Sequence, residues 1–305
     1  MTLPDRIRIT EVGPRDGLQN EKAIVGVDDK VAFIDLLSAA RPAEIEVTSF
    51  VSPKWVPQLA DADDVFAHIK RAEGVVYSAL APNERGLERA LRANVDKIAV
   101  FTAASETFSR RNVNASIAES LARFIPVIRG AMDAGRPVRG YVSCAVACPY
   151  EGPVDPAAVR DVAARLLDLG VDEIDLGDTI GVAVPTDIEA LYDELDGLLE
   201  PAETTLHLHD TRGTALACAC RAMQLGVSRF DASCAGLGGC PYAPGAAGNL
   251  ATEDLVYLCQ RMGCETGMDL EKQLEAGRHV AGVIGRTPTG RVFRAEGRQE
   301  RSSSV

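Results

Sequence analysis

The chain lacks the features that typify membrane, secreted and nucleic-acid-binding proteins. Its 305 residues contain no apolar run near the roughly 20 residues that cross a bilayer. Charged residues appear as early as Asp5 and Arg6, which leaves no apolar stretch of a secretory leader. A net charge of −12 opposes binding to nucleic acid or to an anionic membrane surface. We therefore expect a cytoplasmic protein with no nucleic-acid partner and no membrane partner.

The sequence also lacks the cysteine pattern of a disulfide framework. Its eight cysteines form no C-x-x-C pair, and a large chain without a secretion signal seldom carries disulfides. About seven of them are expected to be small buried apolar residues. Cys240 differs because it lies in the glycine- and proline-rich segment 236–245, which has the composition of a lid. A thiol there, beside a metal and cationic groups, is suited to acid–base chemistry.

A glycine-rich dinucleotide-binding turn is missing after the first predicted strand. What the chain does have is a regular alternation of β-rich runs and helical periodicity. Strands are predicted near 6–12, 43–50, 75–81, 96–102, 138–146, 173–177, 204–209 and 229–234. Helices are predicted near 28–40, 61–73, 84–93, 114–134, 155–169, 185–199, 212–225 and 250–262. Eight such pairs imply parallel strands joined by right-handed crossovers.

The pattern favours an α/β fold, a single (β/α)8 TIM barrel, over the alternative of an open doubly wound sheet. The length suits a barrel, which needs roughly 250 residues. Glycines that follow a helical pattern and precede a strand fit left-handed helix ends: Gly74, Gly135, Gly170 and Gly226. We expect the barrel domain to span 1–285, with a C-terminal helical extension near 269–284, and 286–305 to be a mobile tail.

Polar side chains gather at the carboxyl ends of the predicted strands, where the active site of a TIM barrel lies. These residues are Glu11, Arg15, Asp16, Glu46, Asp175, Asp178, His207, His209, Asp210, Asp231 and Cys240. The loops at the opposite end hold mostly Gly, Asn and ordinary surface charge. This asymmetry indicates an enzyme.

His207 and His209 are the most specific feature of the seventh strand. Positions i and i+2 of a strand project on the same face, so both imidazoles can reach one point in the barrel mouth. Two hydrogen-bonded core histidines are the alternative, and the acidic neighbours favour a metal. Asp16 and Asn249 lie in loops at the same end and are candidate oxygen ligands. Two nitrogens and two oxygens suit Mg²⁺ or Mn²⁺, with Zn²⁺ as the alternative.

Arg15 lies in the turn GPRDG at 13–17, directly after the first strand. Glycines on both sides shape this turn so that Arg15 and Asp16 can project into the barrel mouth. An arginine there is suited to hold an anionic oxygen of a substrate or transition state by charge-assisted hydrogen bonds. A surface Arg–Asp pair is the alternative interpretation.

With these residues placed, the chain resembles the 3-hydroxy-3-methylglutaryl-CoA lyase family of the DRE-TIM metallolyase superfamily. The likeness is carried by EVGPRDGLQNEK at 11–22, IEVTSFVSPKWVPQ at 45–58, AASE at 103–106, CPYEG at 148–152, LGDTIG at 176–181, HLHD at 207–210 and GLGGCPY at 236–242, followed by GNLATE at 248–253. In this order the segments are highly specific, and they span nearly the whole chain.

The resemblance implies metal-dependent cleavage of 3-hydroxy-3-methylglutaryl-CoA, an acyl-CoA substrate, to acetyl-CoA and acetoacetate, as in leucine degradation. Ligands to Mg²⁺ or Mn²⁺ would be Asp16, His207, His209 and Asn249. Catalytic roles would fall to Arg15, Glu46, Asp178, His207 and Cys240. Substrate contacts would come from Arg15, Gln19 and Thr179, with Glu253 as a lesser candidate.

One departure from the family pattern concerns the substrate. After HDT at 209–211 the family usually carries an aromatic residue, where this chain has Arg212. A related lyase that accepts a longer branch at C3 is therefore an alternative. A Claisen-condensing synthase, a pyruvate-releasing aldolase and an inactive barrel used as a binding module are further alternatives. The sequence leaves the oligomeric state open, and a homo-oligomer is compatible with it.

Overall fold

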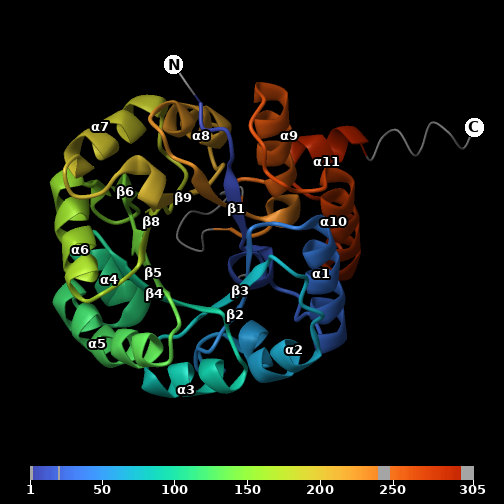
Figure 1. The fold of residues 1–305 in the computed structure, drawn as a ribbon, viewed down its shortest axis with the longest axis horizontal. Coiled ribbons are helices and arrows are strands. Elements are labelled where there is room, and N and C mark those ends of the chain that lie inside the picture. The colour runs from blue at the N-terminus through green and yellow to red at the C-terminus, as the bar shows by residue number, and fades with distance from the viewer. Residues whose placement is uncertain (1–2, 20, 240–247, 297–305) are drawn as a thin grey trace, which may run out of the picture.

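A computed structural model describes residues 3–19, 21–239 and 248–296 and contains a closed barrel of parallel strands (Figure 1). The strands follow one another around the barrel in the order β1-β10-β9-β8-β5-β4-β3-β2. Their bounds are β1 Arg8–Glu11, β2 Glu44–Ser49, β3 Val76–Leu80, β4 Lys97–Ala103, β5 Val138–Ser143, β8 Glu173–Asp178, β9 Thr204–Leu208 and β10 Arg229–Ala232. The predicted TIM barrel is confirmed, and each predicted strand has its counterpart.

Helices surround the barrel and bury their apolar sides against the strands (Figure 1). Their bounds are α1 Val27–Ala40, α2 Ala62–His68, α3 Glu84–Arg92, α4 Glu106–Val113, α5 Ile117–Asp133, α6 Pro156–Asp168, α7 Pro185–Leu195, α8 Ala215–Gln224, α9 Thr252–Met262, α10 Leu270–Ile284 and α11 Arg291–Glu296. The extension predicted near 269–284 is α10, which packs against α1. The elements that were not predicted include α4 and the small hairpin of β6 Ala147–Cys148 and β7 Gly152–Pro153.

The glycines predicted to follow helices and precede strands adopt left-handed backbone conformations, with φ between 66° and 103°. The prediction of a helix over 61–73 needs a correction, because α2 ends at His68. The backbone N–H of Lys70 donates to Asp35, and that of Ala72 donates to the hydroxyl of Tyr77. Side chains distant in sequence therefore satisfy these donors, and the segment leaves the helix.

The prediction of a tail beginning at residue 286 also needs a correction, because α11 packs against α9. Asp254 of α9 accepts hydrogen bonds from the backbone N–H groups of Arg291 and Val292, at 2.9 and 2.7 Å. The Arg291 side chain reaches Asp210, the residue after His209, at 2.6 Å. Thr289 donates to the carbonyl of Gly236 at 3.1 Å. These bonds bring the segment that follows α10 close to the end of β9.

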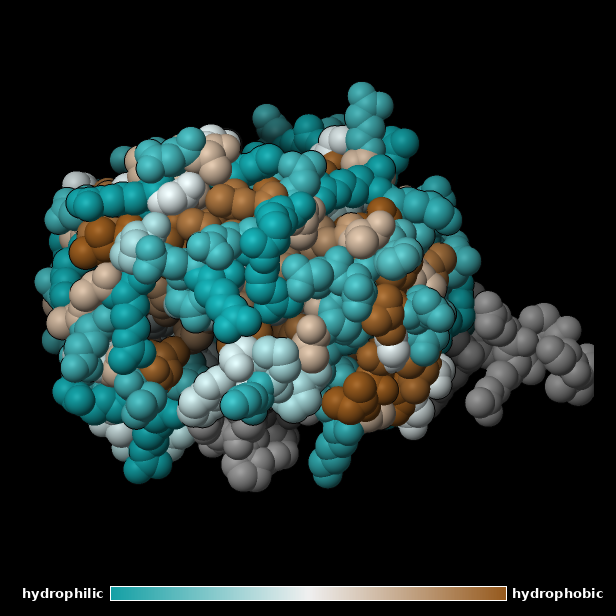
Figure 2. Space-filling model, turned by 90° about the horizontal axis from the view of Figure 1, so that it is seen from below, coloured by the Kyte–Doolittle hydropathy of each residue, from teal (hydrophilic) through white to brown (hydrophobic). Residues whose placement is uncertain are grey.

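The side of the outer surface drawn in Figure 2 is mainly hydrophilic. Figure 2 shows one side of the barrel, where hydrophilic residues cover most of the face and hydrophobic ones lie between them in smaller groups. Isolated apolar side chains on a surface are ordinary. Among the described helices, none has both the length and the apolar character required to cross a membrane.

Candidate metal centre and active site

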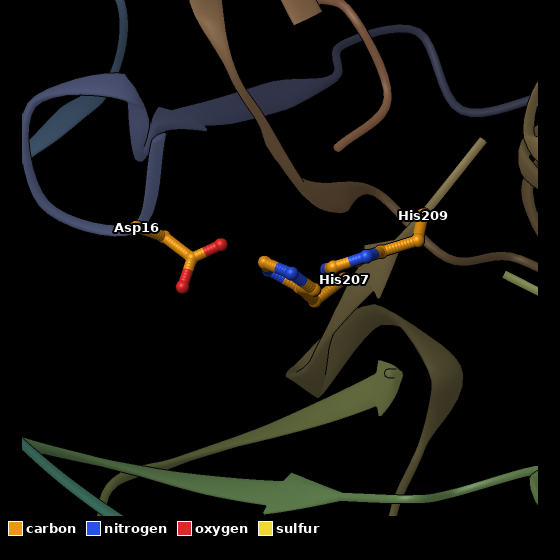
Figure 3. A group of neighbouring side chains, drawn as sticks. All are labelled: Asp16, His207 and His209. Atoms are coloured by element: carbon orange, nitrogen blue, oxygen red, sulfur yellow. The ribbon is translucent and has the colours of Figure 1, made fainter. Parts of the chain in front are cut away.

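His207 and His209 lie at the end of β9 and point into the barrel mouth. Their ring centroids are 5.2 Å apart, and both residues are buried. Figure 3 shows the two imidazoles beside each other and Asp16 facing them from the turn after β1. The prediction that alternate positions of one strand would bring both rings to one place is therefore confirmed.

Asp16 is delivered by a single π-helical turn, Gly13–Gly17, rather than by a simple loop. Both Asp16 and Gly17 donate their backbone N–H to the carbonyl of Val12, at 2.8 and 3.1 Å. Single π turns occur often at functional sites because they redirect side chains. One ligand atom from each of Asp16, His207 and His209 lies within 4.8 Å of the others. These three residues can bind one ion.

Asn249 adds a fourth side chain, from a third segment of the chain. Its backbone forms an isolated β-bridge with His209, which fixes the two residues side by side. Its Nδ2 donates to Asp16 Oδ2 at 2.8 Å and to the carbonyl of Leu237 at 3.1 Å. Its Oδ1 is buried without a hydrogen-bond partner among the described residues. A Cβ at Gly238 would lie 2.7 Å from the Asn249 amide, so glycine is required there.

The two imidazoles differ in the partners of their Nδ1 atoms. Nδ1 of His207 lies 3.0 Å from Asp231 Oδ2, which leaves its other nitrogen for an ion. Nδ1 of His209 is buried and has no partner among the described residues. Burial, followed by the charge of His207, lowers the pKa of His209 to about 4. A neutral imidazole is the form that binds a metal.

The chemistry of these four residues determines which kind of ion the site can bind. Two imidazoles and a carboxylate converge, the Asn249 amide adjoins that carboxylate, and Nδ1 of His209 and Oδ1 of Asn249 are buried without partners among the described residues. A buried polar atom without a partner costs free energy, which an ion bound there would recover. The pKa of Asp16 is lowered, because the charge of Arg15 outweighs burial, so its carboxylate is ionised. The donor set therefore fits a divalent metal.

Arg15 lies beside the metal centre. Its Nε donates to Glu46 of β2, its Nη1 lies 2.6 Å from Asp16, and its guanidinium carbon is 5.5 Å from the Tyr141 ring centroid. Burial raises the pKa of Glu46, although the charge of Arg15 opposes this. Both side chains are almost fully buried. The predicted cation and its carboxylate partner therefore adjoin the metal ligands.

Asp178 ends β8 on the other side of His207. Its two oxygens accept the backbone N–H groups of Val182 and Ala183, at 3.1 and 3.0 Å. Burial raises its pKa, although these hydrogen bonds act in the opposite direction. The neighbouring Thr179 accepts a hydrogen bond from the backbone N–H of Cys144 at 2.8 Å. The Thr179 hydroxyl therefore also supports the loop of β5, and its substrate contact stays a prediction.

Gln19, Glu253 and Cys240 are the remaining residues that the sequence predicts at the site. Gln19 is half-buried directly after the π turn, beside the mouth. Glu253 is fully buried under the segment after β10, where it accepts the backbone N–H of Ala235 at 3.0 Å, so it supports that segment. Cys240 lies outside the described residues.

Two residues beside His207 have no predicted role from the sequence, namely Asp231 and Arg139. Asp231 of β10 contacts His207, and Arg139 of β5 contacts Asp231 at 3.1 Å from within the barrel. In the sequence, Asp231 can be recognised only as an acidic residue at the end of a predicted strand. Arg139 can be recognised only as a charged residue, two positions before Tyr141, in a strand whose other residues suit burial. Only the pairing of β9 with β10 shows that His207 and Asp231 are direct register partners.

A TIM barrel with a mixed nitrogen and oxygen metal centre, an adjacent arginine and buried carboxylates with raised pKa values defines a metal-dependent enzyme with acid–base groups. A family model described as HMGL-like matches residues 6–280. The mitochondrial hydroxymethylglutaryl-CoA lyase of Rattus norvegicus is 51% identical over 294 residues, which cover 96% of this chain and 90% of the relative.

Solved structures agree with this match. The hydroxymethylglutaryl-CoA lyase of Pseudomonas aeruginosa has a TM-score of 0.96 and 47% identity, covering 98% of this chain and 100% of that one. An HMG-CoA lyase from Acinetobacter baumannii, in complex with coenzyme A and 3-methylmalate, has a TM-score of 0.91 and 36% identity, covering 97% and 96%. The chain belongs to the hydroxymethylglutaryl-CoA lyase family.

Proposed function

We propose that the chain cleaves 3-hydroxy-3-methylglutaryl-CoA to acetyl-CoA and acetoacetate, with Mg²⁺ or Mn²⁺ held by Asp16, His207, His209 and Asn249. The observation that carries the proposal is the convergence of these ligands beside Arg15 at the barrel mouth. The chain is 51% and 49% identical to two curated hydroxymethylglutaryl-CoA lyases, in each case over 96% of its length. An acyl-CoA substrate is supported by the coenzyme A complex of a relative.

The chemistry of the cleavage explains the residue types. The C2–C3 bond breaks, the C3 hydroxyl loses its proton to become a ketone, and the electron pair forms the enolate of acetyl-CoA. That enolate then takes a proton at C2, so the reaction needs a base, an acid and a stabiliser of the enolate oxygen. When bound, a divalent cation would supply Lewis-acid polarisation of substrate oxygens.

Each remaining requirement has a candidate side chain. Arg15 holds the negative charge of the enolate oxygen through its fixed set of N–H donors. Glu46 and Asp178 lie near the reacting hydroxyl, and burial raises their pKa values toward the range useful for a base. His207 and Cys240 take part in proton transfer, and the role of Cys240 rests on the family resemblance. Gln19 and Thr179 contact the substrate.

The test is an assay of purified protein with 3-hydroxy-3-methylglutaryl-CoA and added Mg²⁺ or Mn²⁺. We expect acetyl-CoA and acetoacetate in equal amounts, and loss of both after chelation. Release of neither product with either metal would contradict the proposal. Condensation of acetyl-CoA with a 2-oxo acid in the same preparation would instead favour a synthase.

The contacts of Arg212 give no reason to expect a longer-branched substrate. Its Nη1 donates to the carbonyls of Ile180 and Gly181, both at 3.2 Å, in the loop after β8. The guanidinium is thus bound to backbone rather than projecting as a new wall of the substrate pocket. Assays with substrates of increasing branch length test this directly. Preference for a longer branch would overturn the specific assignment while leaving the reaction class intact.

The biological setting follows from the reaction. We assign it to leucine degradation, where a branched 3-hydroxyacyl-CoA is cleaved, and to the cytoplasm. Relatives named as mitochondrial and as cytoplasmic both occur. Growth on leucine after deletion of the gene tests the pathway, and cell fractionation tests the location. Light scattering of the purified protein would test for a homo-oligomer.

A further inference from the structure

Asp231 is a buried carboxylate inside the barrel, directly below the metal centre. It is 1% exposed, and it is the register partner of His207 across β9 and β10. Its Oδ2 lies 3.0 Å from His207 Nδ1 and accepts the hydroxyl of Tyr141 at 3.4 Å. Its Oδ1 accepts Nη1 of Arg139 at 3.1 Å. Each oxygen of this carboxylate therefore has its own partners.

Arg139 determines which oxygen of Asp231 faces His207. A guanidinium only donates hydrogen bonds, so the oxygen that faces it must accept. Arg139 is itself 2% exposed and lies between Glu44, Glu173 and Asp231, so it cannot move away without leaving buried charges unpaired. The carboxylate is thereby held with Oδ2 toward the imidazole. An acceptor at this place keeps the proton of His207 on Nδ1.

We propose that Asp231 is a positioning residue that fixes the Nδ1–H tautomer of His207 and so directs the Nε2 lone pair toward Asp16 and His209. A metal-binding imidazole usually donates its other N–H to a carboxylate or carbonyl, which sets both tautomer and ring orientation. The inference deepens the proposed function, on whose metal centre it rests. It concerns the ion site alone and does not depend on the substrate.

The substitution Asp231→Asn discriminates between positioning and simple packing. Arg139 requires an acceptor, so the amide oxygen must take the place of Oδ1. The amide nitrogen then takes the place of Oδ2 and donates toward Nδ1 of His207. The ring must then carry its proton on Nε2, which removes the lone pair that would bind the ion. A nearly isosteric change therefore reverses the tautomer.

Asp175→Asn provides the matched control. Asp175 of β8 is equally buried, belongs to the same cluster and contacts Arg139 at 3.5 Å. Asp175 shares a hydrogen bond with Asp231, and an asparagine there can still donate its amide to Asp231, so we expect the pair between Asp231 and His207 to stay intact. Asp231→Ala is a third variant, in which the imidazole loses its orienting acceptor without facing a new donor.

The first measurement is the Mn²⁺ dissociation constant of each full-length protein without substrate, by electron paramagnetic resonance of free Mn²⁺. We expect Asp231→Asn to weaken binding by about 10- to 100-fold, Asp231→Ala to weaken it no more than Asp231→Asn does, and Asp175→Asn to leave it unchanged. The second measurement is the ¹⁵N chemical shifts of His207 in metal-free protein. We expect the Nδ1–H form in the parent and the Nε2–H form in Asp231→Asn.

Several results would overturn the inference. These are parental Mn²⁺ affinity in Asp231→Asn, an equal loss in Asp175→Asn, or an Nε2–H tautomer in the parent. Circular dichroism and urea unfolding check that the variants fold. If Asp231→Asn does not fold, the tautomer of the parent alone decides the matter. Because no substrate is present, failure of the lyase assay would leave this result standing, and the two failures are distinguishable.

Discussion

The two ends of the barrel use buried charge in opposite ways. At the mouth, Asn249 Oδ1 and His209 Nδ1 are buried without partners among the described residues. At the opposite end, Lys97 lies 2.6 Å from Glu44 and 2.8 Å from Glu173, and Arg139 lies 2.7 Å from Glu173. These charges surround a cavity of about 40 Å³ and compensate one another.

The two ends of the barrel therefore differ in the property that a substitution should change most. The buried atoms without partners at the mouth destabilise the metal-free protein, and an ion bound there would satisfy them. At the other end Glu44 Oε1 and Arg139 Nε also lack hydrogen-bond partners among the described residues, but the charges there are paired with one another. Removing one partner would leave the rest buried and uncompensated. Substitutions at the mouth should therefore mainly reduce activity. Those at the opposite end should mainly reduce stability, with Arg139 also affecting the mouth through Asp231.

The largest effect is expected from His209→Ala. Loss of one ring nitrogen from the ion site should reduce the lyase rate by about 10³-fold or more, since a Lewis acid contributes several kcal/mol to the barrier. The metal-free protein should be as stable as the parent or more stable, because a buried orphan nitrogen is removed. Steady-state kinetics and urea unfolding measure the two quantities. His68→Ala, on the exposed end of α2, is the control and should change neither.

Arg139→Met tests the opposite end. We expect the free energy of unfolding to fall by about 3–5 kcal/mol, because the carboxylates around Arg139 lose a common cation. Arg165→Met removes an exposed partner of Asp161 on α6 and should cost under about 1 kcal/mol. Urea unfolding of both variants makes the comparison. Equal losses would show that the buried cluster is no more important than a surface pair.

The prediction of the barrel succeeded because its signals are local. Alternating strands, glycine helix ends and two histidines at i and i+2 are readable within a few residues of each other. The early end of α2 was missed because it depends on residues distant in sequence. Asp35 and Tyr77 accept hydrogen bonds from backbone N–H groups of the segment that follows α2. The role of Asp231 was missed for the same reason, since it depends on which strands are neighbours.

Two buried glutamates beside the mouth make stability depend on pH. Burial raises the pKa of Glu11 to about 7 and that of Glu253 to about 8. An unfolded chain has ionised both above their ordinary pKa of 4.5, while the folded protein keeps the protons until pH 7–8. The folded state thus binds more protons, and its stability falls as the pH rises.

We expect a loss on the order of 2–4 kcal/mol between pH 6.5 and pH 9 in metal-free protein, from urea unfolding at each pH. The variant Glu253→Gln should show a flatter dependence, because one of the two titrating groups is gone. Stability that rises over this interval would contradict the assignment of raised pKa values.

The smallest effect is expected from Arg212→Ala. Two hydrogen bonds to the backbone after β8 are lost at an exposed position, which should cost about 0.5–1.5 kcal/mol. Mn²⁺ affinity should stay at the parental value, because no metal ligand contacts this side chain among the described residues. A large loss of metal affinity would show that the loop after β8 helps to hold the centre together.

The proposed ligands of the metal centre come from distant parts of the chain. Asp16 and Asn249 are 233 residues apart, and they meet only when β1 pairs with β10 to close the barrel. A nascent chain still short of residue 249 therefore cannot bind the ion as the complete protein does. During refolding, tight Mn²⁺ binding should appear together with the last strand pairing rather than with collapse. Binding of the ion would thus report completed folding as well as supply the proposed reaction.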